Sequence, residues 1–140
     1  MGVSISAKNA SYSFDMGGGG FFNLRKNIAY ALDNDFGEVY AQIIKCYTSE
    51  ECRDNDRKAE EIINSKHLDD EYTDVLDFLY ASDCEGKISY KTCKKIYDLI
   101  KDIDFGDKGF RYAMRSHNDY EEFKAFLKEC YSHRRTMYWY

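Results

Sequence analysis

Two short segments near the N-terminus alternate polar and apolar residues. Residues 2–7 read Gly-Val-Ser-Ile-Ser-Ala and residues 11–16 read Ser-Tyr-Ser-Phe-Asp-Met, with Lys8 and Asn9 between them. Alternation with a period of two is typical of strands that bury one face, and short polar segments form turns. The pattern therefore predicts two antiparallel strands joined as a hairpin.

Most of the remaining chain carries apolar residues three and four positions apart, which is the spacing of amphipathic helices. The first such run starts at Phe21, directly after the glycines Gly17–Gly20, which we expect to form a loop. Further helices are expected over residues 36–47, 59–63, 72–79, 93–100 and 120–130. Residues 49–51 are expected in a polar connection, and Ser89 is a candidate N-cap.

The C-terminal part adds two further segments with strand character. Residues 110–114 predict a strand, and the aromatic Met137–Tyr140 segment predicts an edge strand with Trp139 in the core. The expected fold class is α+β, with a small antiparallel sheet formed by the N-terminal hairpin and the C-terminal segments. We expect a helix-rich single domain over residues 1–140, because a chain of this length buries about two thirds of its surface.

Composition excludes several classes of protein. An aromatic content of 16% excludes a disordered chain, and no window approaches the roughly 18 consecutive apolar residues of a membrane span. The five cysteines form no C-x-x-C pair, so we expect free thiols in the cytoplasm, with Cys93 and Cys130 buried on apolar stripes. We expect no metal site, no cofactor and no membrane contact.

The charge is unevenly distributed along the chain. The formal net charge is −5, yet residues 49–85 alone carry 13 acidic and 4 basic side chains. The candidate partner-binding residues are the carboxylates of Asp69, Asp70, Glu71, Asp74 and Asp77. Such a row complements the lysines and arginines of a basic groove, so we expect a host protein with such a groove as the partner.

The proline-free composition, rich in Lys, Asn, Ile, Tyr and Asp, is similar to that of small cytosolic proteins of AT-rich Gram-positive bacteria and their phages. No catalytic constellation stands out, so the favoured hypothesis is a non-enzymatic protein-binding module. We expect a phage or mobile-element inhibitor of a host nucleic-acid-binding defence protein, of the anti-CRISPR type.

The C-terminal residues combine cations with rings that could stack on bases. Arg134 and Arg135 precede Tyr138 and Tyr140, and residues 86–140 carry 12 basic and 8 acidic side chains. This excess of positive charge is small for a nucleic-acid-binding protein, so we expect no direct binding to DNA or RNA.

The alternative function is a domain that binds a nucleotide or another phosphate ligand. A glycine-rich segment before a helix can turn backbone N–H groups toward a phosphate. The candidate residues are Gly18, Gly19, Gly20, Arg25 and Lys26. The spacing departs from a dinucleotide fingerprint, because Phe22 stands where glycine is needed, and from a P-loop, because Gly-Lys-Ser/Thr is absent.

Residues 81–92 resemble an EF-hand loop, with Gly86 in the sixth position. Ala81 and Thr92 occupy the first and twelfth positions, where calcium ligands belong. We therefore expect a helix-turn-helix in which Gly86 permits the turn and no calcium is bound.

Overall fold

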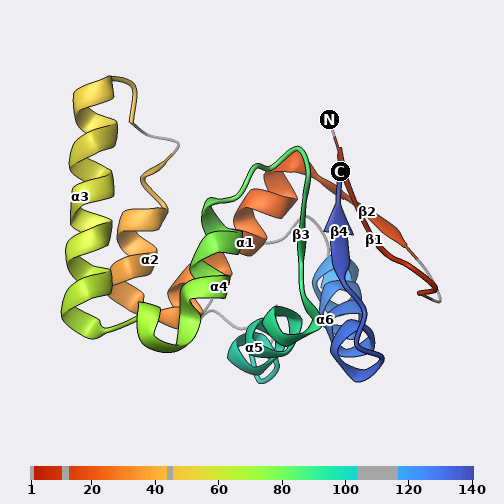
Figure 1. The fold of residues 1–140 in the computed structure, drawn as a ribbon. Helices are drawn as coiled ribbons and strands as arrows, with labels where there is room; N and C mark the ends of the chain where they lie inside the picture. The colour runs from red at the N-terminus through yellow and green to blue at the C-terminus, as the bar shows by residue number, and fades with distance from the viewer. Residues whose placement is uncertain (1, 11–12, 44–45, 104–116) are drawn as a thin grey trace.

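The structure is a computed structural model of the chain, and it describes residues 2–10, 13–43, 46–103 and 117–140. Within these ranges the chain forms strands β1 (Gly2–Ala7), β2 (Phe14–Gly17), β3 (Gly86–Ile88) and β4 (Met137–Trp139) (Figure 1). The helices are α1 (Gly18–Leu32), α2 (Asn34–Tyr40), α3 (Ser49–Lys66), α4 (Asp69–Tyr80), α5 (Tyr90–Ile100) and α6 (His117–Ser132). The expected α+β fold class is confirmed.

The four strands form one antiparallel sheet in the order β2-β1-β4-β3. The N-terminal hairpin is confirmed, and the two ends of the chain lie side by side in the sheet (Figure 1). The expectation that the C-terminal segment is an edge strand was wrong, because β4 pairs with β1 on one side and β3 on the other. The strand at this edge of the sheet is β3, whose residues the sequence pattern had assigned to a turn.

The helix boundaries differ from the periodic pattern at three places. The helix expected over residues 36–47 is wrong at its C-terminal end, because α2 ends at Tyr40. The glycines Gly18–Gly20 form the first turn of α1 rather than a loop. Helix α3 begins at Ser49, inside the expected polar connection, because Thr48 is an effective N-cap: its side chain accepts a hydrogen bond from the backbone N–H of Glu51. The Glu51 carboxylate accepts one from the N–H of Tyr47 at 2.8 Å. These bonds satisfy backbone donors that an uncapped helix start would leave exposed.

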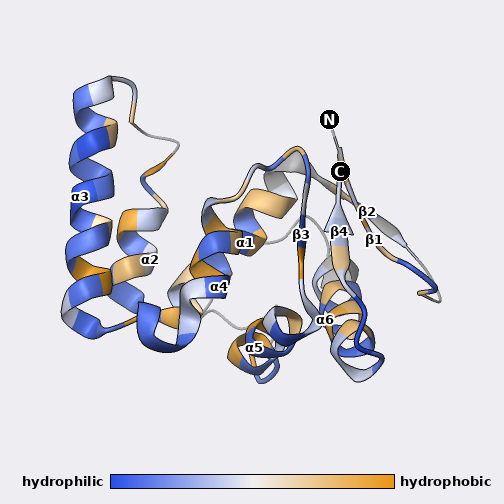
Figure 2. Cartoon of the chain, viewed as in Figure 1, coloured by the Kyte–Doolittle hydropathy of each residue, from blue (hydrophilic) through white to orange (hydrophobic). Residues whose placement is uncertain are grey.

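The core lies between the inner face of the sheet and the helices. Trp139 is 1% exposed, as expected, and its ring lies 6.0 Å from that of Phe21 on α1 and 5.3 Å from that of Phe78 on α4. Cys93 and Cys130 are buried in the same core, as their spacing predicted. By contrast α3 is largely hydrophilic and lies at the far end of the molecule from the sheet (Figure 2).

Position 86 requires glycine because a neighbouring ring packs closely against it, and not because the chain turns there. None of the glycines in the described ranges has a positive φ, and Gly86 lies in β3 opposite Trp139. A Cβ at this position would overlap the Trp139 indole. The prediction of a Gly86 turn was therefore wrong. The strand predicted over residues 110–114 lies outside the described residues.

Replacing Gly86 with alanine should therefore destabilise the fold. We expect Gly86→Ala to lower the free energy of unfolding by about 1–3 kcal/mol, because the new methyl group must displace a buried ring. Urea denaturation measures the change. Gly20→Ala is the matched control: its Cβ would meet only Met16 Cγ at 3.3 Å within a helix, so the change should stay within about 1 kcal/mol. Equal stability of both variants would contradict this packing.

Candidate functional site

The acidic candidates lie on α4, whose first turn holds Asp69, Asp70 and Glu71. Negative side chains are favourable at a helix N-terminus, where backbone N–H groups lack partners. Tyr72 has non-helical dihedral angles (φ −119°, ψ 22°), so this acidic turn is kinked away from the rest of the helix. The carboxylates therefore do not follow one straight helical row.

Four of the five candidate carboxylates face solvent. Asp69, Asp70, Glu71 and Asp77 are exposed. Within the described part of the chain, none of these four side chains forms an ion pair or a hydrogen bond. Their charges add to one another without a compensating lysine or arginine, which makes this side of α4 a negative surface.

Asp74 has a different role and does not belong to this surface. Its carboxylate accepts hydrogen bonds from the Thr92 hydroxyl at 2.8 Å and from the Lys95 ammonium at 3.1 Å, which joins α4 to α5. Burial alone would raise the pKa of Asp74, but the bonds from Thr92 and Lys95 outweigh it and hold the pKa below its ordinary value. The prediction that Asp74 contacts a partner is therefore corrected to an internal role.

A depression of about 270 Å³ adjoins the acidic turn and is lined by Asp70, Glu71, Tyr72, Lys95 and Asp98. Lys95 does not neutralise Asp70 or Glu71, because its ammonium bonds Asp74 and the backbone carbonyl of Glu71. The depression therefore keeps the negative sign of the helix turn beside it.

Tyr80 closes the other end of α4 and is 45% exposed. Its ring meets Tyr40 edge-on at 5.6 Å between centroids, and it lies 6.3 Å from Phe36. Burial, followed by the nearby carboxylate of Asp56 on α3, raises the pKa of Tyr80 to about 12. Tyr80 is thus a neutral ring, packed against Tyr40 and Phe36, at the C-terminal end of the acidic helix. The sequence analysis did not identify it as a candidate.

The phosphate-site candidates are only partly brought together. Gly18–Gly20 open α1, but the Arg25 guanidinium donates to the backbone carbonyls of Ala81 at 2.9 Å and Ser82 at 3.2 Å. Lys26 is also buried, with its ammonium 4.8 Å from the centroid of the Phe22 ring. Both cationic side chains are buried in contacts with the core and do not extend to the N-terminus of α1. A phosphate at the glycines would therefore bind without them.

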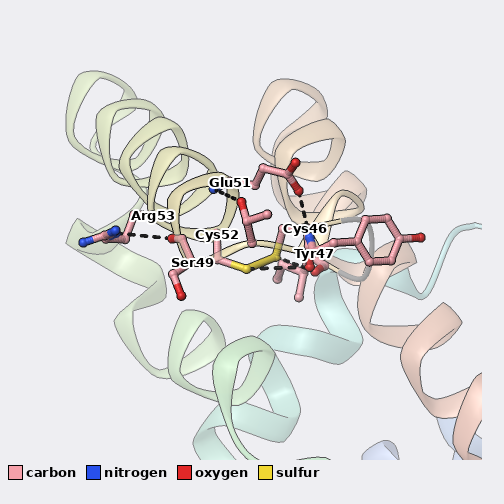
Figure 3. The surroundings of a disulfide bond; sticks show 8 residues. Cys46, Tyr47, Ser49, Glu51, Cys52 and Arg53 are labelled. Atoms are coloured by element: carbon pink, nitrogen blue, oxygen red, sulfur yellow. Dashed lines mark hydrogen bonds between the residues drawn. A yellow bond between two sulfur atoms is a disulfide. The ribbon is translucent and has the colours of Figure 1, made fainter.

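A disulfide joins Cys46 to Cys52 in the first turn of α3, with 5.2 Å between the Cα atoms (Figure 3). The expectation of free thiols was wrong for this pair, because the N-capping turn at Thr48 folds the chain back and brings the two sulfurs together. Cys84, Cys93 and Cys130 remain free thiols. The contact with Cys130, followed by burial, raises the pKa of Cys93, which keeps that thiol protonated.

Comparison with known proteins does not identify the chain: no family model, no curated protein and no solved structure matches it. None of the helices in the described ranges is long and apolar enough to cross a membrane. In the same ranges, no three His, Cys, Asp or Glu side chains are grouped so that they could hold a metal ion.

The role of Asp74 predicts a pH dependence of stability. A lowered folded pKa means that the carboxylate stabilises the fold above its ordinary pKa of 3.8, and that this contribution is lost as the pH falls through the folded value. We expect Asp74→Asn to cost about 1–2 kcal/mol near neutral pH. The difference from wild type should shrink as the pH is lowered below 3.8.

Urea denaturation across this pH range measures both effects. Asp70→Asn is the matched control, because the Asp70 carboxylate is exposed and has no bond to the described residues. It should leave stability within about 0.5 kcal/mol of wild type. A cost of Asp74→Asn that stays constant as the pH falls would contradict the assigned bonds.

Proposed function

We propose that this protein is a non-enzymatic protein-binding module that docks through the acidic side of α4 onto a basic groove of a partner protein. The observation that carries the proposal is the set of exposed carboxylates without an ion-pair partner in the described ranges: Asp69, Asp70, Glu71 and Asp77.

Several carboxylates of α3 and α5 are paired with cations, although α3 also carries exposed carboxylates such as Glu60 that have no ion pair within the described ranges. On α3 the Arg57 guanidinium lies 3.7 Å from Asp54 and 3.2 Å from Glu61, and on α5 the Lys94 ammonium lies 2.9 Å from Asp98. Pairs of this kind neutralise a surface locally, although each contributes little to stability. The acidic side of α4 keeps its full charge and is therefore available to a partner of opposite sign.

The chemistry of this surface favours one class of partner. A protein groove that holds nucleic-acid phosphates presents rows of lysine and arginine, and exposed carboxylates can occupy those rows in place of phosphates. Tyr80 adds a ring of the kind that anchors many interfaces. We therefore propose inhibition of a host nucleic-acid-binding defence protein by competition for its groove, as an anti-CRISPR-type protein of a phage or mobile element would do.

The proposed compartment is the cytoplasm, where glutathione would keep Cys46 and Cys52 reduced. The capping bonds of Thr48 and Glu51 hold the same turn without the disulfide. The proposed surface on α4 contains neither cysteine, so its use does not depend on the state of this pair.

Binding to a fluorescein-labelled octalysine peptide tests the acidic surface directly. We expect Asp70→Lys/Asp77→Lys to weaken binding at least about tenfold at low salt, and wild-type binding to weaken strongly on going from about 50 to about 200 mM NaCl. Fluorescence anisotropy measures the dissociation constant.

The matched control is Glu50→Lys/Glu60→Lys, which changes the net charge equally at two exposed carboxylates of α3. It should weaken octalysine binding less than about threefold, as expected of a general charge effect. Equal loss in both double variants would show that total charge, rather than α4, attracts the peptide, and would remove the proposed surface.

A further inference from the structure

The outer face of the sheet carries two exposed rings, one on β4 and one directly after it. Met137 and Trp139 of β4 point into the core, whereas Tyr138 is 41% exposed and Tyr140, just beyond the strand, is 62% exposed. This alternation follows from the period of two along a strand. The two tyrosines therefore share the face of the sheet that points away from the core.

The sheet register brings a cation beside Tyr138. Lys87 on β3 lies directly opposite Tyr138, and Ser6 on β1 lies opposite it on the other side. Directly opposed residues on one face have Cβ atoms about 4.5–5.5 Å apart. Lys87 and Ser6 are separated by 81 positions in the chain, so no local sequence pattern predicts this arrangement.

A depression of about 350 Å³ lies next to the same ring, at the start of β4. Its lining includes Lys8, His133, Arg134, Arg135, Thr136 and Tyr138. Arg135 is paired with Glu129 at 2.8 Å. Lys8, Lys87 and Arg134 are exposed and have no ion pair within the described ranges. Three uncompensated cations thus surround one exposed ring on a chain whose net charge is −5.

The turn between α6 and β4 holds this arrangement in place. Arg134 adopts a left-handed conformation (φ 54°), and the backbone N–H of Arg135 donates to the carbonyl of Cys130 at 2.8 Å. This is the hydrogen-bond pattern of a Schellman helix end, which fixes the direction in which the chain leaves the helix. The turn therefore fixes the backbone of Arg134 beside the depression that Tyr138 also lines.

We propose that this outer sheet face binds single-stranded nucleic acid, with a base stacked on Tyr138 and the neighbouring phosphates held by Lys8, Lys87 and Arg134. Aromatic rings accept any base because every base has a π-face, and cations beside the ring follow the phosphate backbone. Four-stranded antiparallel sheets with exposed rings on central strands are an established platform for such strands.

Charge also sets the extent of the proposed site. Asp15 on β2 lies opposite Ser4, which lies opposite Tyr140, so the far corner of the outer face is acidic. Phosphates are favoured at the Tyr138 end and disfavoured toward Asp15. The overall charge of the chain had argued against nucleic-acid binding, but the fold collects the relevant cations on one face. This site is independent of α4 and of the function proposed for it.

The test is anisotropy titration of a fluorescein-labelled dodecathymidylate at about 50 and about 200 mM NaCl. Tyr138→Ala should weaken binding at least about fivefold, since a stacking partner is lost. Lys8→Ala/Arg134→Ala should weaken it at least about tenfold and reduce the salt slope by about 1.4, as loss of two phosphate contacts on a single strand requires.

Two exposed residues at the α3 end of the molecule provide matched controls. Tyr47 is 87% exposed and Lys58 is exposed, so Tyr47→Ala and Lys58→Ala should each stay within about twofold of wild type. The Tyr138 and Lys8/Arg134 variants should bind octalysine at least as tightly as wild type does, which separates this site from the one on α4.

Several results would overturn the proposal: no binding of the dodecathymidylate, unchanged binding by both site variants, or equal affinity for the corresponding duplex. Duplex binding of that strength would mean attraction to phosphates without stacking. Displacement of the strand by inorganic phosphate at equal phosphate concentration would assign the site to a free anion instead. Because Tyr138, Lys8 and Arg134 are all exposed, thermal melting should confirm that each variant remains folded.

Discussion

A buried guanidinium joins the N-terminal and C-terminal parts of this fold. Arg25 on α1 is 4% exposed and donates to the carbonyls of Ala81 and Ser82 at the end of α4. The indole N–H of Trp139 on β4 donates to the same Ser82 carbonyl at 2.9 Å. The guanidinium carbon lies 4.5 Å from the centroid of the Phe21 ring and 5.8 Å from that of Trp139. A helix, a loop and a central strand thus share one polar cluster.

The hydrogen bonds of this cluster are important because a buried guanidinium that loses its partners would be strongly destabilising. Burial lowers the pKa of Arg25, partly offset by Tyr40 and Asp83, yet a guanidinium stays charged in any folded protein. Within the described ranges its Nε has no hydrogen-bond partner, so the surrounding ring faces and the two carbonyls must offset the cost of burial. The segment after α4 is thereby fixed, which sets where β3 joins the sheet. The acidic side of α4 and the basic outer face of the sheet then belong to different parts of the surface.

The elements that the sequence predicted well are those whose pattern is local. Alternation predicted the β1–β2 hairpin, three- and four-residue spacing predicted most helices, and Ser89 was found as the cap of α5, accepting a hydrogen bond from the N–H of Thr92. The central place of β4 could not be predicted, because a three-residue partner such as β3 is too short to carry a period.

The candidate site was predicted in part for the same reason. The acidic composition of α4 predicts exposed acids there. The internal role of Asp74 depends instead on Thr92 and Lys95, which lie 18 and 21 positions further along the chain. Arg25 resembled a surface cation in the sequence, since charged residues are almost never fully buried without partners. Its partners are backbone carbonyls more than 50 positions away, and backbone acceptors leave no trace in a sequence.

The most direct test of this account is the free energy of unfolding of Arg25→Lys, measured by urea denaturation against Arg53→Lys. Lysine keeps the charge of Arg25 but cannot reach both carbonyls with a planar fork, so we predict a loss of about 2–4 kcal/mol. Arg53 is exposed on α3, and its substitution should change stability by no more than about 0.5 kcal/mol. An Arg25→Lys variant as stable as Arg53→Lys would contradict the claim that this guanidinium holds the two parts of the fold together.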